Sequence, residues 1–443
     1  MSGSVNEVSR VARILIVAYT SYHRDSRVKR NAEALAERGD QVDVISLSAG
    51  PQGLSRGVNI IGLPMPRYRG DSRIAYLRSY LNFFIKASRH ATRLSRYKRY
   101  DVVIICTMPD AAVLCALGPK FYGAKVILDV HDTMPELYQD KFSGYLGRLG
   151  SRMLTVEERA SAWFADRVLA VHEPHRQRLA KSGIPAGKLN VVMNLPDQRL
   201  FRRSLIPENP IYVDATLNGE STLESAGIAG STDAQLADRE GVFKLVCHGT
   251  ITFRLGIDLA IQAVSLLRPR IPAIHLDIIG EGDFLSSAQE LTRRLGLQQQ
   301  VTFTPSMAVE QLPSVLTQAL VGIVPNRASR ATHLMLPAKL LEYATLGMPV
   351  IAARLRTMEY YFPAGTVQYF EPGDVQGLVR AIDDLYRHPE KRRLLGRLAA
   401  EVASRLSWEQ QRAQLFDSVD SLLVARHKAA GRCREFQPLT EIR

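Results

Sequence analysis

The 443-residue chain has few of the residues that build disulfide frameworks or metal clusters. Its four cysteines form no Cys-x-x-Cys pair and have no metal-ligand spacing with the histidines, so we expect neither disulfides nor a zinc site. Such usage is typical of a reducing compartment. No apolar run reaches the roughly 18–20 residues that cross a bilayer. The polar residues 1–10 lead into a strand too short for a signal-peptide core. We therefore expect a cytoplasmic protein, soluble or peripheral on the inner face of the membrane.

Acidic residues are outnumbered by basic ones. The 57 Lys and Arg against 44 Asp and Glu give a net charge of +13, and such a chain is drawn to nucleotides, phospholipid surfaces or other anions. The excess gathers in residues 67–101, which hold ten basic residues and two acids with interleaved aromatics. In helical register, the apolar stripe of this segment consists of Ile74, Leu77, Leu81, Phe84 and Ile85.

This basic segment has two readings that the sequence leaves open. An amphipathic helix with a basic face can lie on an anionic membrane. It can equally be a domain helix whose basic face is solvated. No nucleic-acid-binding motif accompanies the charge, so we do not expect a nucleic-acid partner.

Buried strands alternate with helices in the first half of the chain. A strand at 13–19, a helix at 25–38 and a strand at 41–46 form the unit that opens a doubly wound parallel sheet. The loops 20–27 and 131–136 follow strands and are rich in polar side chains. Ligands of such sheets bind at the carboxyl ends of the strands. Further strands of this half are expected at 101–106, 124–130, 167–171 and 189–194.

The second half repeats the alternation after a change in composition. Residues 207–240 hold seven acids against one arginine, which is typical of a loosely ordered insertion. We expect a Rossmann-like acceptor domain at 1–206, this acidic linker, a donor domain at 241–406, and a C-terminal helix and tail at 407–443 that cross back to the first domain. Two similar α/β halves imply a cleft between them. The strands expected in the second half lie at 243–247, 275–279, 301–303 and 321–324.

A helix expected from about Leu336 to Gly347 has an unusual charge at its start. Pro337 suits the first helical turn because its missing N–H would be unpaired there, and Gly347 suits the end. Lys339 and Glu342 are three apart and share one side of the helix. A lysine in the first turn opposes the helix dipole by about 0.3–1 kcal/mol, so the position makes sense if an anion binds there. The alternative is an ordinary surface pair of Lys339 with Glu342.

Five motifs follow one another in the second half. Their order resembles that of the retaining GT-B glycosyltransferases of family 4, closely over 243–424 and more loosely over the first half. The resemblance implies an α/β fold with two Rossmann-like, doubly wound parallel-sheet domains facing each other across a cleft. The motifs are His248-Gly249-Thr250, Arg254-Leu255-Gly256, Ile278-Ile279-Gly280-Glu281-Gly282, Lys339-Leu340-Leu341-Glu342-Tyr343 with Gly347-Met348-Pro349-Val350, and Glu371-Pro372-Gly373-Asp374.

The resemblance implies how the donor diphosphate is held. In this family a basic pair after the first strand of the second domain acts with the N-terminus of a later helix. Gly249 and Thr250 lie in that loop, but Thr250 stands where the family has arginine and Leu255 where it has lysine. Arg254 is then the cation that the loop supplies, and Lys339 supplies a second one from the helix.

A second family motif consists of a glutamate, a Phe-Gly pair, and another glutamate eight residues after the first. Glu342 corresponds to the second glutamate, which accepts hydrogen bonds from the donor ribose. Leu334 stands at the first, and Leu336-Pro337 at the Phe-Gly pair, so the carboxylate that contacts the sugar is absent. Thr332, His333 or backbone N–H groups would replace that contact.

In the first domain the resemblance rests on two loops. Asp129-Val130-His131-Asp132 is similar to the loop whose histidine approaches the transferred sugar, which implies a catalytic role for His131 and a place for Asp132 beside it. Asp25 and Arg27 belong to a first loop that would face the acceptor or the donor phosphate. Asp25 is also suited to cap the helix that follows. The role of residues 172–175 stays open.

The implied reaction transfers a hexose from a nucleotide diphosphate to an acceptor hydroxyl with retention at the anomeric carbon. UDP is the expected nucleotide and GDP the second choice. The acceptor would be a sugar, a lipid-linked sugar or a small molecule, in cell-surface polysaccharide or glycolipid synthesis. The sequence shows no facing pair of carboxylates of the kind that a retaining hydrolase uses. This absence favours a front-face route. We expect no metal, because no Asp-x-Asp motif is present, and no cofactor besides the donor.

Two other functions stay open from the sequence alone. A nucleotide-sugar epimerase or hydrolase would share the fold and the donor site. A non-catalytic protein that binds anions or membranes would use the basic segment 67–101 instead.

Overall fold

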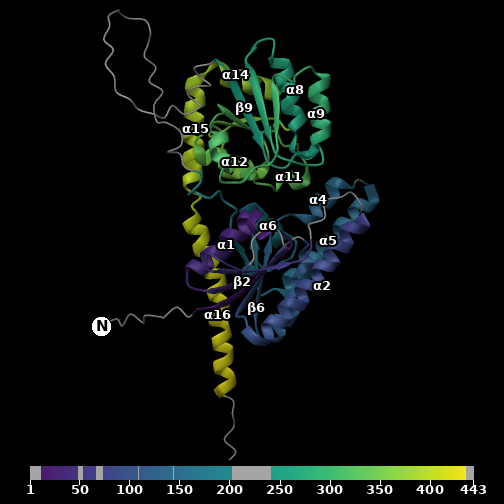
Figure 1. Ribbon diagram of the computed structural model, residues 1–443, viewed down its shortest axis with the longest axis vertical. Helices are drawn as coiled ribbons and strands as arrows, with labels where there is room; N and C mark the ends of the chain where they lie inside the picture. The colour runs from purple at the N-terminus through teal and green to yellow at the C-terminus, as the bar shows by residue number, and fades with distance from the viewer. Residues whose placement is uncertain are drawn as a thin grey trace, which may run out of the picture. The chain divides into compact units, whose positions relative to one another are not determined.

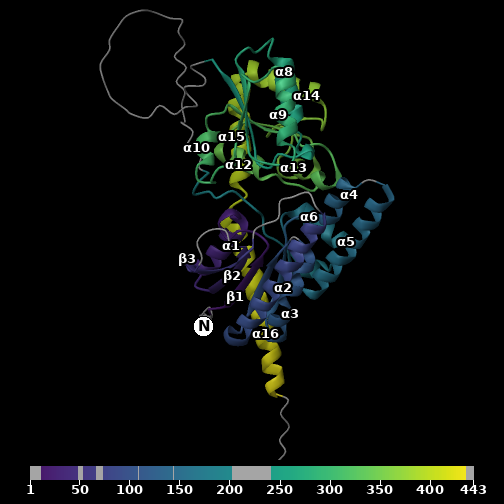
Figure 2. The same cartoon turned by 45° about the vertical axis from the view of Figure 1, so that its right-hand side comes forward.

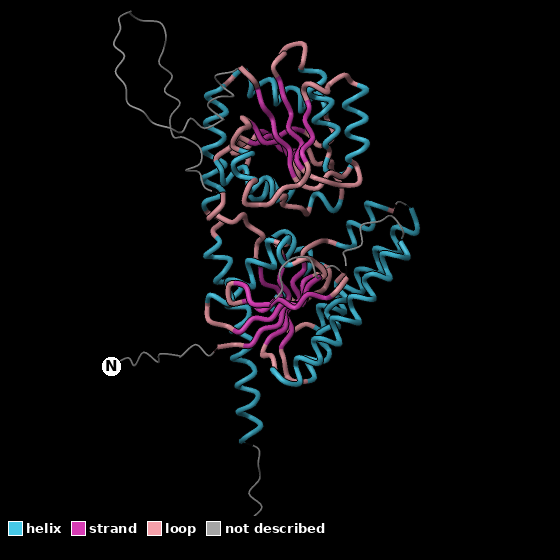
Figure 3. Tube along the Cα trace, viewed as in Figure 1, coloured by secondary structure: helices cyan, strands magenta, loops and turns pink. Residues whose placement is uncertain are grey.

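The computed structural model describes residues 11–47, 53–65, 73–107, 109–142, 144–201 and 241–435. The chain forms two compact units: unit 1 comprises Met1–Asn194 with Glu409–Arg443, and unit 2 comprises Leu195–Trp408. The acidic segment 207–240 and the start of the basic segment, residues 67–72, lie outside the described residues. Each unit is built on one β-sheet, with helices packed around its strands (Figure 1 and Figure 3).

The sheet of unit 1 has the strand order β3-β4-β2-β1-β5-β6-β7-β8, and every pairing except that of β3 with β4 is parallel. All residues of β1 but the first are buried, as expected for a strand covered on both faces. Chain order reverses on the two sides of β1, which makes its carboxyl end the topological switch point where such sheets bind ligands. The strands are β1 (Arg13–Ala18), β2 (Gln41–Leu47), β3 (Gly53–Ser55), β4 (Val58–Leu63), β5 (Val102–Cys106), β6 (Lys125–Val130), β7 (Arg167–Ala170) and β8 (Leu189–Val191).

Helices cover both faces of this sheet. Asp25 caps α1 by accepting a hydrogen bond from the Val28 N–H at 3.1 Å. Among the described residues, no helix combines the length and the apolar character that a bilayer span needs. The helices of unit 1 that precede unit 2 in sequence are α1 (Ser26–Glu37), α2 (Arg73–Lys98), α3 (Leu117–Phe121), α4 (Met134–Lys141), α5 (Gly144–Phe164) and α6 (Glu173–Lys181), with a 3₁₀ helix, η2 (Asp110–Ala116), before α3.

The last helix, α16 (Trp408–Glu435), completes the core of unit 1 although it follows unit 2 in sequence. Leu415, Val419 and Leu422 are buried in the cluster that contains β1 and α1. The Gln411 side chain accepts a hydrogen bond from the Met193 N–H at 2.9 Å.

The sheet of unit 2 is entirely parallel, with the order β11-β10-β9-β12-β13-β14. Chain order reverses at β9, so its carboxyl end is the switch point of this sheet. The α/β fold predicted from the sequence is confirmed, with a doubly wound sheet in each unit. The strands are β9 (Phe243–His248), β10 (Ile274–Ile279), β11 (Val301–Thr304), β12 (Val321–Val324), β13 (Val350–Ala353) and β14 (Gln368–Phe370). The helices are α8 (Ile257–Leu267), α9 (Leu285–Arg294), α10 (Leu312–Leu316), α11 (Arg330–His333), α12 (Ala338–Leu346), α13 (Arg356–Tyr361), α14 (Val375–Arg387) and α15 (Pro389–Ser404), with the short 3₁₀ helix η5 (Phe253–Leu255) before α8.

Helix α12 begins two residues later than the sequence suggests. Pro337 is its N-cap, with an extended ψ of 131°, rather than a residue of its first turn. The helix ends at Gly347 as predicted, because φ is +77° there and the Gly347 N–H bonds to the Ala344 carbonyl.

Candidate active site

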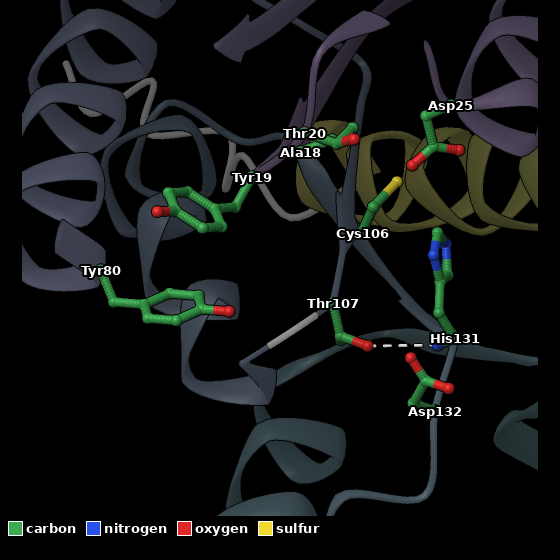
Figure 4. A pocket seen from close by; sticks show the side chains of 9 residues that line it. All are labelled: Ala18, Tyr19, Thr20, Asp25, Tyr80, Cys106, Thr107, His131 and Asp132. Carbon is green, nitrogen blue, oxygen red and sulfur yellow. Dashed lines mark hydrogen bonds between the residues drawn. The ribbon is translucent and has the colours of Figure 1, made fainter. Parts of the chain in front are cut away.

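The carboxyl ends of β1, β5 and β6 surround a pocket of about 150 Å³ in unit 1 (Figure 4). It lies at the switch point of the sheet, where ligand binding is expected. Three of the predicted site residues, Asp25, His131 and Asp132, contribute to its wall. The other lining residues are Ala18, Tyr19, Thr20, Tyr80, Cys106 and Thr107.

His131 is held from both its ring and its backbone. The ring Nε2 lies 3.0 Å from Asp129 Oδ2, and the backbone N–H donates to Thr107 Oγ1 at 3.1 Å (Figure 4). Since Asp129 is fully buried at the end of β6, it fixes the imidazole with its exposed edge toward the pocket. A histidine oriented by a buried carboxylate is suited to polarise or exchange a proton with a ligand.

Arg27 does not line the pocket but lies beneath it. Its side chain is 4% exposed, and its guanidinium binds both oxygens of Asp129, with Nε to Oδ2 at 3.1 Å. Burial alone would raise the pKa of Asp129, but the charges of Arg27 and His131 hold it well below its usual range. The carboxylate therefore stays ionised, and Arg27 serves as its counter-ion.

Cys106, Asp129 and His131 bring ligand-type atoms within 4.8 Å of one another, the one such group among the described residues. Both Asp129 oxygens already accept hydrogen bonds from Arg27 and His131. Burial raises the pKa of the Cys106 thiol well above its usual value, whereas metals bind the thiolate. These contacts fit the orientation of His131 better than the binding of a cation.

In unit 2, the N-terminus of α12 carries a buried lysine. Lys339 is 8% exposed, and its Nζ lies 3.6 Å from Cys247 Sγ. Within the part of the chain that the structure describes, its ammonium meets no carboxylate, although buried lysines are normally paired. No side chain caps the first turn of α12, which leaves backbone N–H groups beside the ammonium. This combination suits an anion.

Glu342 has a hydrogen-bonding partner, His248, that was not predicted from the sequence. His248, the last residue of β9, places its Nε2 2.5 Å from Glu342 Oε2 and its Nδ1 2.8 Å from the Tyr343 hydroxyl. Tyr343 in turn donates to the Val246 carbonyl. The Glu342 carboxylate is therefore fixed from β9, and it does not pair with Lys339.

The loops after β9 and β10 pack backbone against backbone. The Gly249 N–H bonds to the Ile279 carbonyl at 2.9 Å, and a Cβ on Gly280 would lie 1.9 Å from the Gly249 carbonyl oxygen. Gly280 therefore serves this close approach. Gly249 is open enough that a Cβ would lie 3.8 Å from Lys339 Cε, so its backbone borders the buried ammonium.

Arg254 is exposed on η5, where its guanidinium meets no carboxylate among the described residues. A neighbouring arginine holds this short helix in place. Arg327 forms a two-point ion pair with Asp258 at 2.6 and 2.7 Å, stacks 4.1 Å from the Phe253 ring centroid, and donates its backbone N–H to the Arg254 carbonyl. Arg327 is thus a supporting residue that no sequence motif indicated.

The remaining predicted donor residues lie in the loop after β9 and around α11. Thr250 is exposed in the loop after β9. Thr332 is fully buried and caps α11 with Ser329, so its hydroxyl is already used. His333 and Leu336 are partly exposed. Burial and the charge of Arg356 lower the pKa of His333, which favours a neutral ring.

Known proteins match both units. Residues 25–194 match the family described as "Glycosyl transferase 4-like domain", and residues 231–402 match "Glycosyl transferases group 1". A GDP-mannose-dependent alpha-(1-6)-phosphatidylinositol monomannoside mannosyltransferase of Mycolicibacterium smegmatis is 31% identical over 164 residues, or 36% of this chain and 42% of that protein. The sulfoquinovosyl transferase SQD2 of Arabidopsis thaliana is 23% identical over 401 residues, or 88% of this chain and 69% of that protein.

The fold has solved counterparts. The Anabaena protein HepE, in complex with UDP and glucose, superimposes with a TM-score of 0.67 at 16% identity, covering 93% of this chain and all of that one. The matched regions thus include most of both units, while the mannosyltransferase match spans less than half of that relative's length. The chain belongs to the family 4 glycosyltransferases of GT-B fold.

Proposed function

We propose that the protein is a retaining glycosyltransferase that moves a hexose from a nucleotide diphosphate to an acceptor hydroxyl. Unit 2 binds the nucleotide, and unit 1 supplies His131 and the acceptor site. The observation that carries the proposal is the buried ammonium of Lys339 at the uncapped N-terminus of α12. A diphosphate supplies the anion that this site lacks.

In this proposal, Lys339 and Glu342 contact the two ends of the donor nucleotide. Lys339, the first-turn N–H groups of α12 and Arg254 stabilise the diphosphate. Glu342, held by His248, accepts the ribose hydroxyls. Gly249, with Lys339 beside it, lets the phosphate approach the backbone, while Thr250, His333 and Leu336-Pro337 border the donor.

The chemistry proposed is a front-face displacement. The acceptor hydroxyl attacks the anomeric carbon on the side from which the diphosphate departs, and a phosphate oxygen accepts its proton. The main contribution of the protein is then stabilisation of charge on the leaving group. His131, oriented by Asp129, contacts the transferred sugar, and Asp25 and Asp132 face the acceptor.

A screen of nucleotides tests the donor. UDP is our first choice and is the nucleotide bound by HepE, whereas the Mycolicibacterium relative is named as GDP-mannose-dependent. We expect UDP, or GDP in its place, to raise the midpoint of thermal unfolding, and NMR of the product from the matching sugar donor to show the retained anomer. A panel in which neither nucleotide stabilises the protein would refute the donor site.

A nucleotide-sugar epimerase or hydrolase on the same fold is distinguished by omitting the acceptor. Under that condition a transferase consumes the donor slowly. Rapid conversion of the nucleotide sugar without acceptor would instead establish the rival chemistry.

We further propose that the acceptor is lipid-linked or close to a membrane. Helix α2 exposes Arg78, Leu81, Ile85 and Arg89, while Phe83 on its other side is buried in the core. Of the apolar stripe predicted from the sequence, Leu81 and Ile85 are exposed and Phe84 packs against the core. Basic and apolar groups exposed together suit the surface of an anionic bilayer.

His248 gives a specific prediction about nucleotide binding. Replacing it by phenylalanine keeps a ring in the site but removes both side-chain hydrogen bonds, one to Glu342 and one to the Tyr343 hydroxyl. We expect about tenfold weaker UDP binding by calorimetry, since a hydrogen bond to a charged group contributes about 1.5–3 kcal/mol. The control is His275→Gln, a histidine of the same unit that pairs with Asp277. Unchanged affinity in the His248 variant would show that Glu342 needs no support from β9.

A further inference from the structure

Helix α5 exposes large apolar side chains and buries small or charged ones. Tyr145 is 72% exposed, Met153 66%, Val156 64% and Trp163 81%. These positions fall on one face at helical spacing. The fully buried positions of the helix are Gly147, Glu158, Ser161 and Ala162. The apolar face of α5 therefore adds little to the core of unit 1.

The charges of α5 are sorted by sign. Its two acids turn inward: Glu157 accepts a hydrogen bond from the Ala111 N–H at 2.7 Å, and Glu158 pairs with Arg178. The exposed face is therefore apolar and cationic, without an acid. The arginines on it are Arg148, Arg152 and Arg159.

Neighbouring elements continue this face. Helices α2 and α5 run along the same flank of unit 1 (Figure 1 and Figure 2), and both contact η2. After η2, α3 exposes Leu117 (54%) and Phe121 (85%). Lys120 of α3 lies over the Phe164 ring at the end of α5, 4.3 Å from its centroid. Helix α3 thus adjoins the C-terminal end of α5, where Lys120 also pairs with Asp166 at 3.8 Å.

The charge decides what covers the face. A second copy of the chain would set arginine against arginine, in a protein with a net charge of +13. The headgroups of anionic lipids complement the same arginines. Tyrosine and tryptophan favour the boundary between headgroups and acyl chains, and the remaining apolar side chains enter the acyl region.

We propose that the exposed face of α5 seats unit 1 on an anionic bilayer, with Tyr145, Met153, Val156 and Trp163 in the interfacial region. This proposal deepens the membrane association given above for α2 and rests on that part of the proposed function. It adds α5, whose apolar face enters the lipid, to the basic and apolar groups that α2 exposes.

Vesicle flotation tests the surface. The full chain floats with phosphatidylcholine vesicles that contain phosphatidylglycerol and not with phosphatidylcholine alone. The double variant Met153→Glu, Val156→Glu lowers the partition coefficient at least about tenfold, because two apolar contacts are lost and two negative charges face the lipid. A matched control is Leu394→Glu, at a residue of unit 2 that is 46% exposed.

Tryptophan fluorescence locates the insertion. The chain has two tryptophans, so Trp408→Phe leaves Trp163 as the only emitter. Anionic vesicles shift its emission to shorter wavelength, and lipids with brominated acyl chains quench it. Arg152→Glu weakens both effects, whereas Arg397→Glu, at an exposed arginine of unit 2, leaves them unchanged.

The outcomes distinguish a failure of this membrane proposal from a failure of the proposed nucleotide binding and sugar transfer. UDP or GDP binding of the α5 variants stays at the wild-type level, so a defect of unit 2 is recognised independently. The proposal is overturned if the wild type does not float, if the α5 variants float as well as wild type, or if Trp163 emission does not shift. A dimer in light scattering that the α5 substitutions dissociate would also overturn it in favour of self-association.

Discussion

Replacing Lys339 by methionine is expected to lower kcat/KM at least about a hundredfold, which corresponds to about 2.7 kcal/mol of transition-state stabilisation. Methionine keeps an unbranched apolar stem in a site where Lys339 is 8% exposed, so the packing of α12 is preserved. The charge is lost where water is largely excluded, and its interaction with a departing diphosphate is strong there. Steady-state kinetics with a saturating acceptor measures the effect.

The matched control for this variant is Lys391→Met. Lys391 lies on α15 of the same unit, but its Nζ pairs with Asp384 of α14 at a distance of 2.5 Å. We expect wild-type turnover from it. The proposed diphosphate site fails if Lys339→Met retains wild-type turnover.

Arg254→Ala, at the exposed loop cation, is expected to lower turnover at least about tenfold.

The second large effect concerns stability. Asp129→Asn removes the charge from a fully buried carboxylate that binds Arg27 and leaves the guanidinium without its counter-ion. Breaking a buried pair in this way costs about 3–5 kcal/mol. Hydrogen exchange at the backbone amides of β1, β5 and β6 measures the loss in unit 1. Asp132→Asn, in the same loop but partly exposed, is expected to change little.

The same variant changes the response to acid. The folded state holds the pKa of Asp129 below its unfolded value, so the pair stabilises unit 1 above about pH 4 and this contribution is lost as the pH falls further. The asparagine variant has no such group to protonate. Its exchange profile should therefore be flatter than that of the wild type below about pH 4. Parallel profiles would mean that Asp129 does not carry the stabilising charge.

Local patterns were sufficient to predict the elements that position the site. Continuous apolar runs identified the buried parallel strands, and Gly347 identified the end of α12, because a left-handed residue is needed there. Polar residues directly after β1 and β6 indicated the pocket, since parallel strands end at one edge of the sheet. These predictions depend on residues close together in sequence.

The supporting contacts could not be predicted, because their partners are far apart in the chain. His248 and Glu342 are separated by 94 residues, and Arg27 and Asp129 by 102. A single sequence gives no signal for such pairs, and so Arg27 was expected in the binding loop instead of beneath it. The exposure of the apolar face of α5 could not be predicted for a related reason. Apolar spacing shows that a helix has an apolar face, but not whether the core covers that face.

Helix α16 has a consequence for how the protein is made. The first segment of unit 1 ends at Asn194, and its second segment begins at Glu409. At about 5–20 residues per second, a ribosome needs roughly 10–40 s to synthesise the residues between the two segments. During this interval the apolar side chains that later cover Leu415 and Val419 have no helix against them. Unit 2, by contrast, is continuous and emerges complete. Although it comes second in sequence, unit 2 is therefore the part that can finish folding first, whereas the core of unit 1 is completed only when α16 has been made.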